Sequence, residues 1–286
     1  MAGFKRLIPH LFTAGNLIGG VLAIIFALTG RLEWAPYCIF ISAFLDFFDG
    51  FAARLLKVPS ELGKQLDSLA DMVTFGVAPG VIVLMLVKLS ILSTWARPRL
   101  GYNDWQHEYF VLTDFTVLDR IFESEITSPY SSIGNNTQLL FSWLPWFALI
   151  IPVMSMFRLA KFNIDTRQSD SFIGLPTPAN TLFFASLPLI LIQLSGTTSG
   201  WQLWISDLIL NPWFLIIAAV IMSILLVAEL PLFALKFKSF GWKGNEIRYI
   251  FLTLCAVMLA TLWWLAIPLI IILYILLSLI QNLRTR

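Results

Sequence analysis

Eight apolar stretches dominate the chain, and each is about as long as a helix needs to be to cross a lipid bilayer. Spanning segments have roughly 17–25 apolar residues, and they are helical because the bilayer offers no water to satisfy exposed backbone groups. We therefore predict an all-α, polytopic membrane helix bundle. The predicted transmembrane helices cover residues 11–30, 34–56, 66–93, 143–162, 178–197, 212–235, 247–265 and 267–283.

Composition supports a membrane protein. Hydrophobic residues make up 58% of the chain and charged residues 13%, and the mean hydropathy is +0.81. Soluble domains carry about 25% charged residues. The net charge of +2 gives no reason to expect a nucleic-acid partner. Cys38 and Cys255 lie in separate apolar runs and are expected to be small core residues. The first apolar run lacks a small-residue cleavage site after it, so we expect it to remain as a helix.

The distribution of Lys and Arg predicts the orientation. With an inside N-terminus, fourteen of the nineteen Lys and Arg residues fall on the cytoplasmic side, as the positive-inside rule requires. Both termini are then cytoplasmic. The long connection at residues 94–142 carries three basic and six acidic residues, which suits the outer side, and no catalytic pattern is visible in it.

Four aspartates interrupt this apolar background. Asp46 and Asp49 are three residues apart and Asp67 and Asp71 four apart, so each pair lies on one helical face. The link between the two helices is centred near Ser60, about equally far from both pairs. We expect the pairs to face each other at one depth in the cytoplasmic half of the bilayer. Converging carboxylates suit hard divalent cations, Mg²⁺ or Mn²⁺, and two such ions would neutralise four charges.

Two neighbouring residues suit a phosphate ligand. Gly50 follows Asp49 and allows a ligand to approach the backbone, and Arg54 lies one turn further along the same face. Paired metal ions beside a guanidinium match phosphoryl displacement. Two alternatives are structural ion pairs with Lys57 and Lys64, and a sodium or proton pathway of a transporter.

The register of these residues resembles a known family. Residues 46–71 fit D-x2-D-G-x2-A-R-x8-G-x3-D-x3-D at every defined position, which is the signature of the CDP-alcohol phosphatidyltransferases. The resemblance implies a membrane enzyme that transfers a phosphatidyl group from CDP-diacylglycerol to an alcohol and releases CMP. It also implies a six-helix core, to which this chain adds two C-terminal spans.

The resemblance further implies roles for individual residues. Asp46, Asp49 and Asp67 would be metal ligands, and Asp71 would be the general base with a share in metal binding. The residues expected to contact CDP-diacylglycerol are Thr13, Gly50, Arg54 and Ser60.

The acceptor alcohol depends on a second segment, residues 157–180. Its sequence FRLAKFN followed by FIGLPTPAN resembles the bacterial phosphatidylserine synthases of this superfamily, which implies L-serine as the acceptor. Arg158 and Lys161 could bind a carboxylate, and Asn163 and Thr177 could supply polar contacts. A basic cytoplasmic loop without an acceptor role remains an alternative, and glycerol 3-phosphate, inositol phosphate and choline remain possible acceptors.

The predicted organisation has two parts. Residues 1–197 form a catalytic transmembrane domain with the 94–142 insertion, and residues 198–286 complete the bundle. The expected partners are CDP-diacylglycerol, L-serine and membrane lipids, with a possible homodimer. The expected location is the inner, or cytoplasmic, membrane, with the active site facing the cytoplasm.

Overall fold

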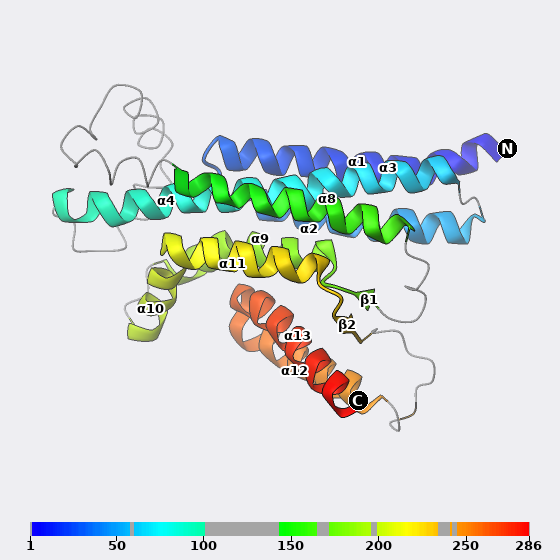
Figure 1. Ribbon diagram of the computed structural model, residues 1–286. Helices are drawn as coiled ribbons and strands as arrows, with labels where there is room; N and C mark the ends of the chain where they lie inside the picture. The colour runs from blue at the N-terminus through cyan, green and yellow to red at the C-terminus, as the bar shows by residue number, and fades with distance from the viewer. Residues whose placement is uncertain are drawn as a thin grey trace.

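The computed structural model describes residues 2–57, 60–100, 143–164, 172–195, 199–233, 241 and 245–285. These residues form a bundle of long helices with one short pair of strands (Figure 1). The all-α membrane fold class is thereby confirmed. Most of the predicted insertion, residues 101–142, lies outside the described residues, but residues 94–100 belong to a helix.

The first half of the described chain contains α1 (Ala2–Leu28), α2 (Trp34–Leu55), α3 (Glu61–Asp71), the π-helix η1 (Met72–Val77), α4 (Ala78–Leu100), the 3-10 helix η3 (Leu144–Leu149) and α8 (Ile150–Ile164). The second half contains β1 (Phe172–Ile173), α9 (Thr177–Leu194), α10 (Gly200–Ile209), α11 (Pro212–Val227), β2 (Pro231–Leu232), α12 (Glu246–Leu262), the 3-10 helix η4 (Trp263–Leu265) and α13 (Ala266–Thr285).

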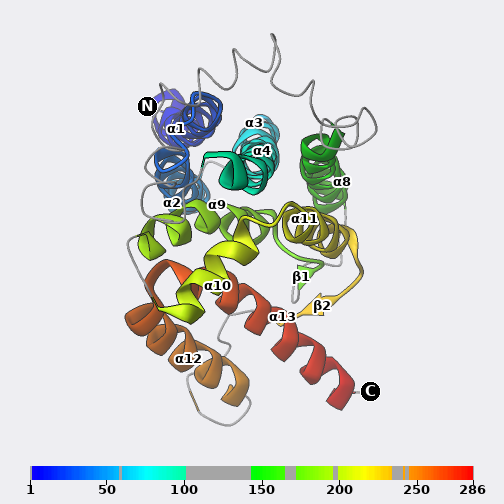
Figure 2. The same ribbon diagram turned by 90° about the vertical axis from the view of Figure 1, so that its left-hand side faces the viewer.

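Each of the eight predicted spans overlaps at least one described helix, but the span predicted at 212–235 runs past the end of α11 at Val227 into β2. The count by length and composition also differs. Five helical segments are long and apolar enough to cross a membrane, or six if α10 and α11, bent by 66° from each other, form one span. α2, which carries Asp46 and Asp49, is not among them. α12 and α13 count as one stretch, although the backbone turns at Trp263 (φ 53°) and the two helices pack side by side (Figure 2). α10 was not predicted.

Both ends of the described chain lie toward one end of the helix bundle. The N-terminus, the end of α2, the start of α3, both strands and the C-terminus lie toward the same end of the molecule in Figure 1.

Glycines let α1 pack closely against its neighbours. A Cβ on Gly19 would lie 3.3 Å from the Cys38 carbonyl oxygen of α2, and a Cβ on Gly20 would lie 2.8 Å from Cα of Thr74 in η1. Small residues of this kind permit helix backbones to approach each other in membranes. The close packing brings the polar face of α1 against both aspartate-bearing helices.

The chain changes helix type directly after Asp71. The π-helix η1 begins at Met72, and π-bulges of this kind occur frequently at functional sites. Two hydrogen bonds tie η1 to neighbouring helices. The Thr181 hydroxyl of α9 donates to the Phe75 carbonyl of η1 (2.7 Å), and the Thr74 hydroxyl of η1 donates to the Asn16 carbonyl of α1 (3.0 Å). The irregular turn is therefore fixed from two sides.

Candidate active site

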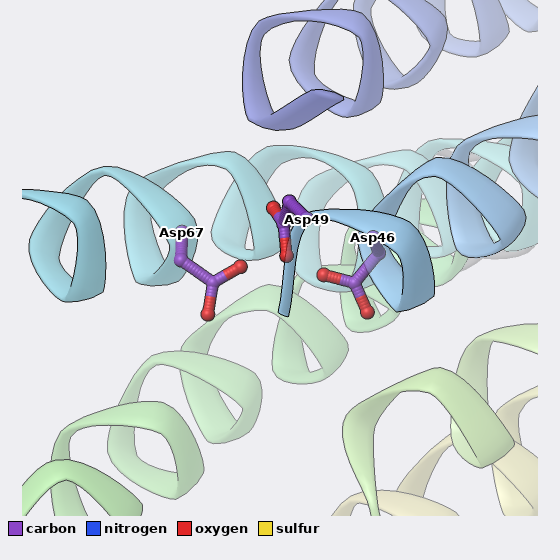
Figure 3. Close-up of side chains that lie close together, drawn as sticks. All are labelled: Asp46, Asp49 and Asp67. Carbon is purple, nitrogen blue, oxygen red and sulfur yellow. The ribbon is translucent and has the colours of Figure 1, made fainter. Parts of the chain in front are cut away.

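Three aspartates converge from two helices. Asp46 and Asp49 on α2 and Asp67 on α3 each present a carboxylate oxygen, and these oxygens all lie within 4.8 Å of one another (Figure 3). The prediction that the two pairs face each other is confirmed for these three residues. Asp71, one turn beyond Asp67, is a close electrostatic neighbour of Asp46 and Asp67 but is not part of that group.

Helix α1 supplies neutral hydrogen-bond donors to the carboxylates. The Thr13 hydroxyl donates to Oδ2 of Asp49 at 2.8 Å. The Asn16 amide donates to Oδ1 of Asp71 at 3.1 Å and, at the long limit of 3.5 Å, to Oδ1 of Asp46. Sequence reasoning singled out Thr13 but missed Asn16. The available signal was its spacing, since a residue three positions after Thr13 lies on the same helical face.

The cluster has the chemistry of a divalent-cation site. Oδ1 of Asp67 is buried and has no hydrogen-bond partner among the described residues, and Asp49 is 6% exposed. None of the four aspartates forms an ion pair with a lysine or arginine in the described part of the chain, and Lys64 donates instead to the Asn163 carbonyl (3.1 Å). Carboxylate oxygens without a cationic side chain fit a hard metal ion, which would neutralise them. The structural ion pairs of the aspartates with Lys57 and Lys64, which the sequence left open as an alternative, are not observed among the described residues.

A cavity of about 220 Å³ adjoins the cluster. Its lining includes five residues that the sequence analysis expects to bind metal or CDP-diacylglycerol: Thr13, Asp49, Gly50, Ser60 and Asp67. His10, Gly63 and Lys64 also line it, and neither His10 nor Lys64 was predicted as a site residue. The cavity lining thus contains both carboxylates, Asp49 and Asp67, and a basic side chain, Lys64.

Ser60 has a local structural role as well. It is the N-cap of α3, and its hydroxyl accepts a hydrogen bond from the Gly63 amide at 3.0 Å. Capping of this kind satisfies an amide that has no partner inside the helix. A Cβ on Gly63 would lie 2.9 Å from Oγ of Ser60 and 3.4 Å from the His10 ring, so the glycine permits this close contact.

Arg54 lies beside the cavity rather than in its lining. Its guanidinium nitrogens are 3.8 and 4.0 Å from the position that a Cβ on Gly50 would occupy. The side chain is exposed and makes no hydrogen bond or ion pair with a described residue. The guanidinium therefore lies beside Gly50, which is itself in the cavity lining.

The predicted acceptor residues occupy different surroundings. Arg158 is 4% exposed, and its Nε donates to the Leu175 carbonyl at 3.3 Å. Lys161 pairs with Glu229 at 3.0 Å. The Asn163 amide donates to Ser68 of α3 at 2.8 Å. Thr177 is 5% exposed in the first turn of α9.

These contacts bring α8 against both α3 and the start of α9, but they do not gather the four side chains into one cluster. The structure adds Asn180, a fully buried residue of α9 whose side-chain oxygen and nitrogen both lack hydrogen-bond partners among the described residues. Sequence reasoning used it only as the end of a motif.

Comparisons with known proteins identify the class. Residues 6–101, which include all four aspartates, match the sequence profile of the CDP-alcohol phosphatidyltransferase family. A CDP-diacylglycerol–serine O-phosphatidyltransferase of Bacillus subtilis is 33% identical over 186 residues, covering 65% of this chain and 75% of that protein. The chain belongs to the CDP-alcohol phosphatidyltransferase family.

Two further relatives carry the same name. The Helicobacter pylori (strain J99) protein is 32% identical over 175 residues, and the matched region spans only 53% of its length. The Saccharomyces cerevisiae protein is 44% identical over 64 residues, which is 21% of this chain and 23% of that protein. The chain therefore spans three quarters of one of these relatives but about half or less of the other two.

Proposed function

We propose that this protein transfers the phosphatidyl group of CDP-diacylglycerol to the hydroxyl of L-serine, giving phosphatidylserine and CMP. The observation that carries the proposal is the carboxylate cluster of Asp46, Asp49 and Asp67 beside a polar cavity. Its residues stand in the register of the family signature, and the relatives described above are named for the serine reaction.

Asp46, Asp49 and Asp67, with Asp71 contributing, would hold Mg²⁺ or Mn²⁺, and two ions suit four carboxylates. Bound there, the cations would supply charge neutralisation of a diphosphate and stabilisation of the departing oxygen. The buried, unpartnered Oδ1 of Asp67 supports this assignment, because an ionised oxygen without a donor is costly to bury.

Asp71 is proposed as the general base. It takes the proton of the serine hydroxyl, whose oxygen forms a bond to the phosphorus attached to the diacylglycerol oxygen. The bond from that phosphorus to the CMP oxygen breaks, and CMP leaves. Of the two carboxylate oxygens of Asp71, the Asn16 amide donates to Oδ1 at 3.1 Å, which would orient the carboxylate with Oδ2 as the oxygen that takes the proton.

The donor lipid nucleotide is proposed to occupy the cavity beside Thr13, Gly50 and Ser60. Gly50 allows a diphosphate to approach the backbone, and the exposed guanidinium of Arg54 beside it offers two donors to phosphate oxygens. Arg54 makes no hydrogen bond or ion pair with a described residue that a ligand would have to displace.

For the acceptor, Arg158, Lys161, Asn163 and Thr177 are proposed to form or border the serine site. The buried guanidinium of Arg158 suits the serine carboxylate, because a buried charge favours an opposite charge with good hydrogen-bond geometry. Lys161, already paired with Glu229, would contribute less direct contact.

The chain is multi-pass, and we place it in the inner, or cytoplasmic, membrane with the active site and both termini facing the cytoplasm. The excess of Lys and Arg on that side supports this orientation. Residues 1–197 would form the catalytic unit, including the 94–142 insertion, and membrane lipids would surround it. A homodimer remains a proposal without an assigned interface.

An acceptor panel tests the function. Purified protein receives labelled CDP-diacylglycerol, Mn²⁺ or Mg²⁺, and in turn serine, glycerol 3-phosphate, inositol phosphate or choline, and CMP and the lipid product are measured. We expect phosphatidylserine, abolished by Asp49→Asn and retained by Asp207→Asn, a carboxylate of α10 outside the cluster. Glycerol 3-phosphate turnover instead would overturn the acceptor, and no CMP with any alcohol would overturn the function.

A further inference from the structure

The segment that precedes α9 is held by the chain that follows α11. β1 and β2 pair in antiparallel register, Phe172 with Leu232 and Ile173 with Pro231. The pairing continues past the strands, because the Gly174 amide donates to the Leu230 carbonyl at 2.8 Å and the Leu175 amide donates to the Leu225 carbonyl at 2.9 Å. We call residues 172–175 the hinge segment.

Gly174 makes this contact possible. Its φ is +78°, a conformation that favours glycine, and a Cβ there would lie 2.7 Å from the Leu226 carbonyl oxygen and 2.9 Å from that of Ala228. Backbone oxygens at such distances cannot move aside as a flexible side chain can. The hinge segment is therefore fitted against the end of α11.

Helix α13 fixes β2 from another side. The Tyr274 hydroxyl donates to the Phe233 carbonyl at 2.9 Å, and the Asn282 amide donates to the Pro231 carbonyl at 2.6 Å. The rings of Tyr274 and Phe233 also meet edge to face, with centroids 4.9 Å apart. The C-terminal helix thus anchors the strand that pairs with the hinge segment, as the neighbouring positions of α13, β2 and β1 in Figure 2 agree.

The hinge segment in turn contacts the proposed acceptor site. Its Leu175 carbonyl accepts the hydrogen bond from Nε of the buried Arg158, and Thr177 follows two residues later. On the same side Glu229, between α11 and β2, pairs with Lys161. Hydrogen bonds therefore connect α13 to β2, β2 to the hinge segment, and the hinge segment to Arg158.

We propose that α13 and the α11–β2 connection position the acceptor alcohol, with Tyr274, Asn282 and Gly174 as positioning residues that act through the hinge segment on Arg158 and Thr177. The proposal rests on the proposed function and goes beyond it, because it gives residues 225–282 a role in acceptor binding. The described residues that line the donor cavity all fall between Pro9 and Asp67, and none of them takes part in these contacts. The two substrates should therefore respond differently to changes in α13.

Kinetics of Tyr274→Phe and Asn282→Ala test this separation. Each removes one hydrogen bond to the backbone of residues 231–233, so we expect the KM for serine to rise about 2- to 10-fold per variant. The KM for CDP-diacylglycerol should stay within about twofold of the wild-type value, because the donor site shares no hydrogen bond with α13 and distant sites behave independently. Ser278→Ala is the matched control, because among the described residues this buried hydroxyl on α13 bonds to its own helix alone, at the Tyr274 carbonyl (2.8 Å).

A second measurement keeps the structural link separate from the kinetics. Hydrogen–deuterium exchange at the Gly174 and Leu175 amides should accelerate in the double variant Tyr274→Phe/Asn282→Ala and not in Ser278→Ala. Faster exchange with a selective rise in the acceptor KM supports the inference. Unchanged acceptor KM, or equal rises for both substrates, overturns it even if exchange accelerates.

The outcomes also separate this inference from the proposed function. If the wild-type protein uses another alcohol, the same comparison is made with that alcohol and tests the positioning role directly. If the wild-type protein releases no CMP with any alcohol, the proposed function fails and the inference fails with it. Wild-type turnover with an acceptor KM that the variants leave unchanged overturns the inference alone.

Discussion

Asn16 provides the sharpest test of how the carboxylates are organised. Its side chain is fully buried and its amide nitrogen donates to Asp71 at 3.1 Å and to Asp46 at 3.5 Å. Asn16→Ala removes the donor and leaves both carboxylates in place. It also preserves the backbone carbonyl that accepts the Thr74 hydroxyl, so the contact between α1 and η1 should survive.

The expected loss follows from the hydrogen bond to Asp71. A hydrogen bond to a charged group contributes about 1.5–3 kcal/mol, and the 3.5 Å contact with Asp46 is too long to add much. If the bond orients Asp71 for proton transfer, kcat/KM should fall by about 10- to 160-fold, since each 1.36 kcal/mol is tenfold in rate. The fall should appear mainly in kcat, because Asn16 is not in the lining of the donor cavity.

The assay is CMP release from CDP-diacylglycerol and serine at saturating Mn²⁺, with folding followed by thermal unfolding in the same detergent. Asn211→Ala is the matched control. Asn211 caps α11 by accepting from the Trp213 and Phe214 amides at 2.9 and 3.3 Å, so its loss should lower stability by about 1 kcal/mol without affecting kcat. If kcat/KM of folded Asn16→Ala protein falls less than about threefold, the orienting role is refuted. The activation free energies of the variant and the wild type would then differ by less than about 0.7 kcal/mol.

Three further changes have defined outcomes. Asp67→Asn should raise the Mn²⁺ concentration for half-maximal activity at least about tenfold, read from a metal titration after EDTA treatment, because it removes one carboxylate of the group. Gly20→Ala should lower the unfolding free energy by about 1–3 kcal/mol, since its Cβ would lie 2.8 Å from Cα of Thr74, whereas Gly200→Ala, with nothing within 4 Å, should be nearly neutral by thermal unfolding. Ser60→Ala should destabilise the protein by about 1 kcal/mol through loss of the α3 cap, and Ser60→Thr should recover most of that loss.

The aspartate cluster could be predicted from spacing because it depends on helical geometry alone. Residues three or four apart share a face, and a short link places two antiparallel helices in register. That reasoning locates Asp46, Asp49 and Asp67 without any knowledge of tertiary contacts. It cannot place Asn16 beside Asp71, because that contact depends on how α1 packs against η1 through Gly19 and Gly20.

The acceptor segment shows the opposite case. The resemblance of residues 157–180 to the serine synthases singled out Arg158 and Lys161 on α8, but their burial and pairing depend on segments far along the chain. Glu229 pairs with Lys161, and Leu175 accepts from Arg158 only because the segment preceding α9 is held against α11. A local pattern could suggest the charges, but not which of them is already neutralised.

The choice of donors in α1 explains why the cluster has the chemistry of a metal site rather than of a structural network. Three of the four carboxylates accept a hydrogen bond from an amide or a hydroxyl, both neutral. Lys64 donates to the Asn163 carbonyl, and Arg54 forms no ion pair with a described residue. Neutral donors can orient carboxylates but cannot offset their mutual repulsion, which at the 4.8 Å limit amounts to about 3.5 kcal/mol for each ionised pair at an effective dielectric constant of about 20. Cationic side chains in these places would stabilise the fold and compete with a divalent ion for the same oxygens. In this protein the negative charge of the aspartates would be offset by a bound metal ion. Metal affinity and fold stability therefore depend on the same residues.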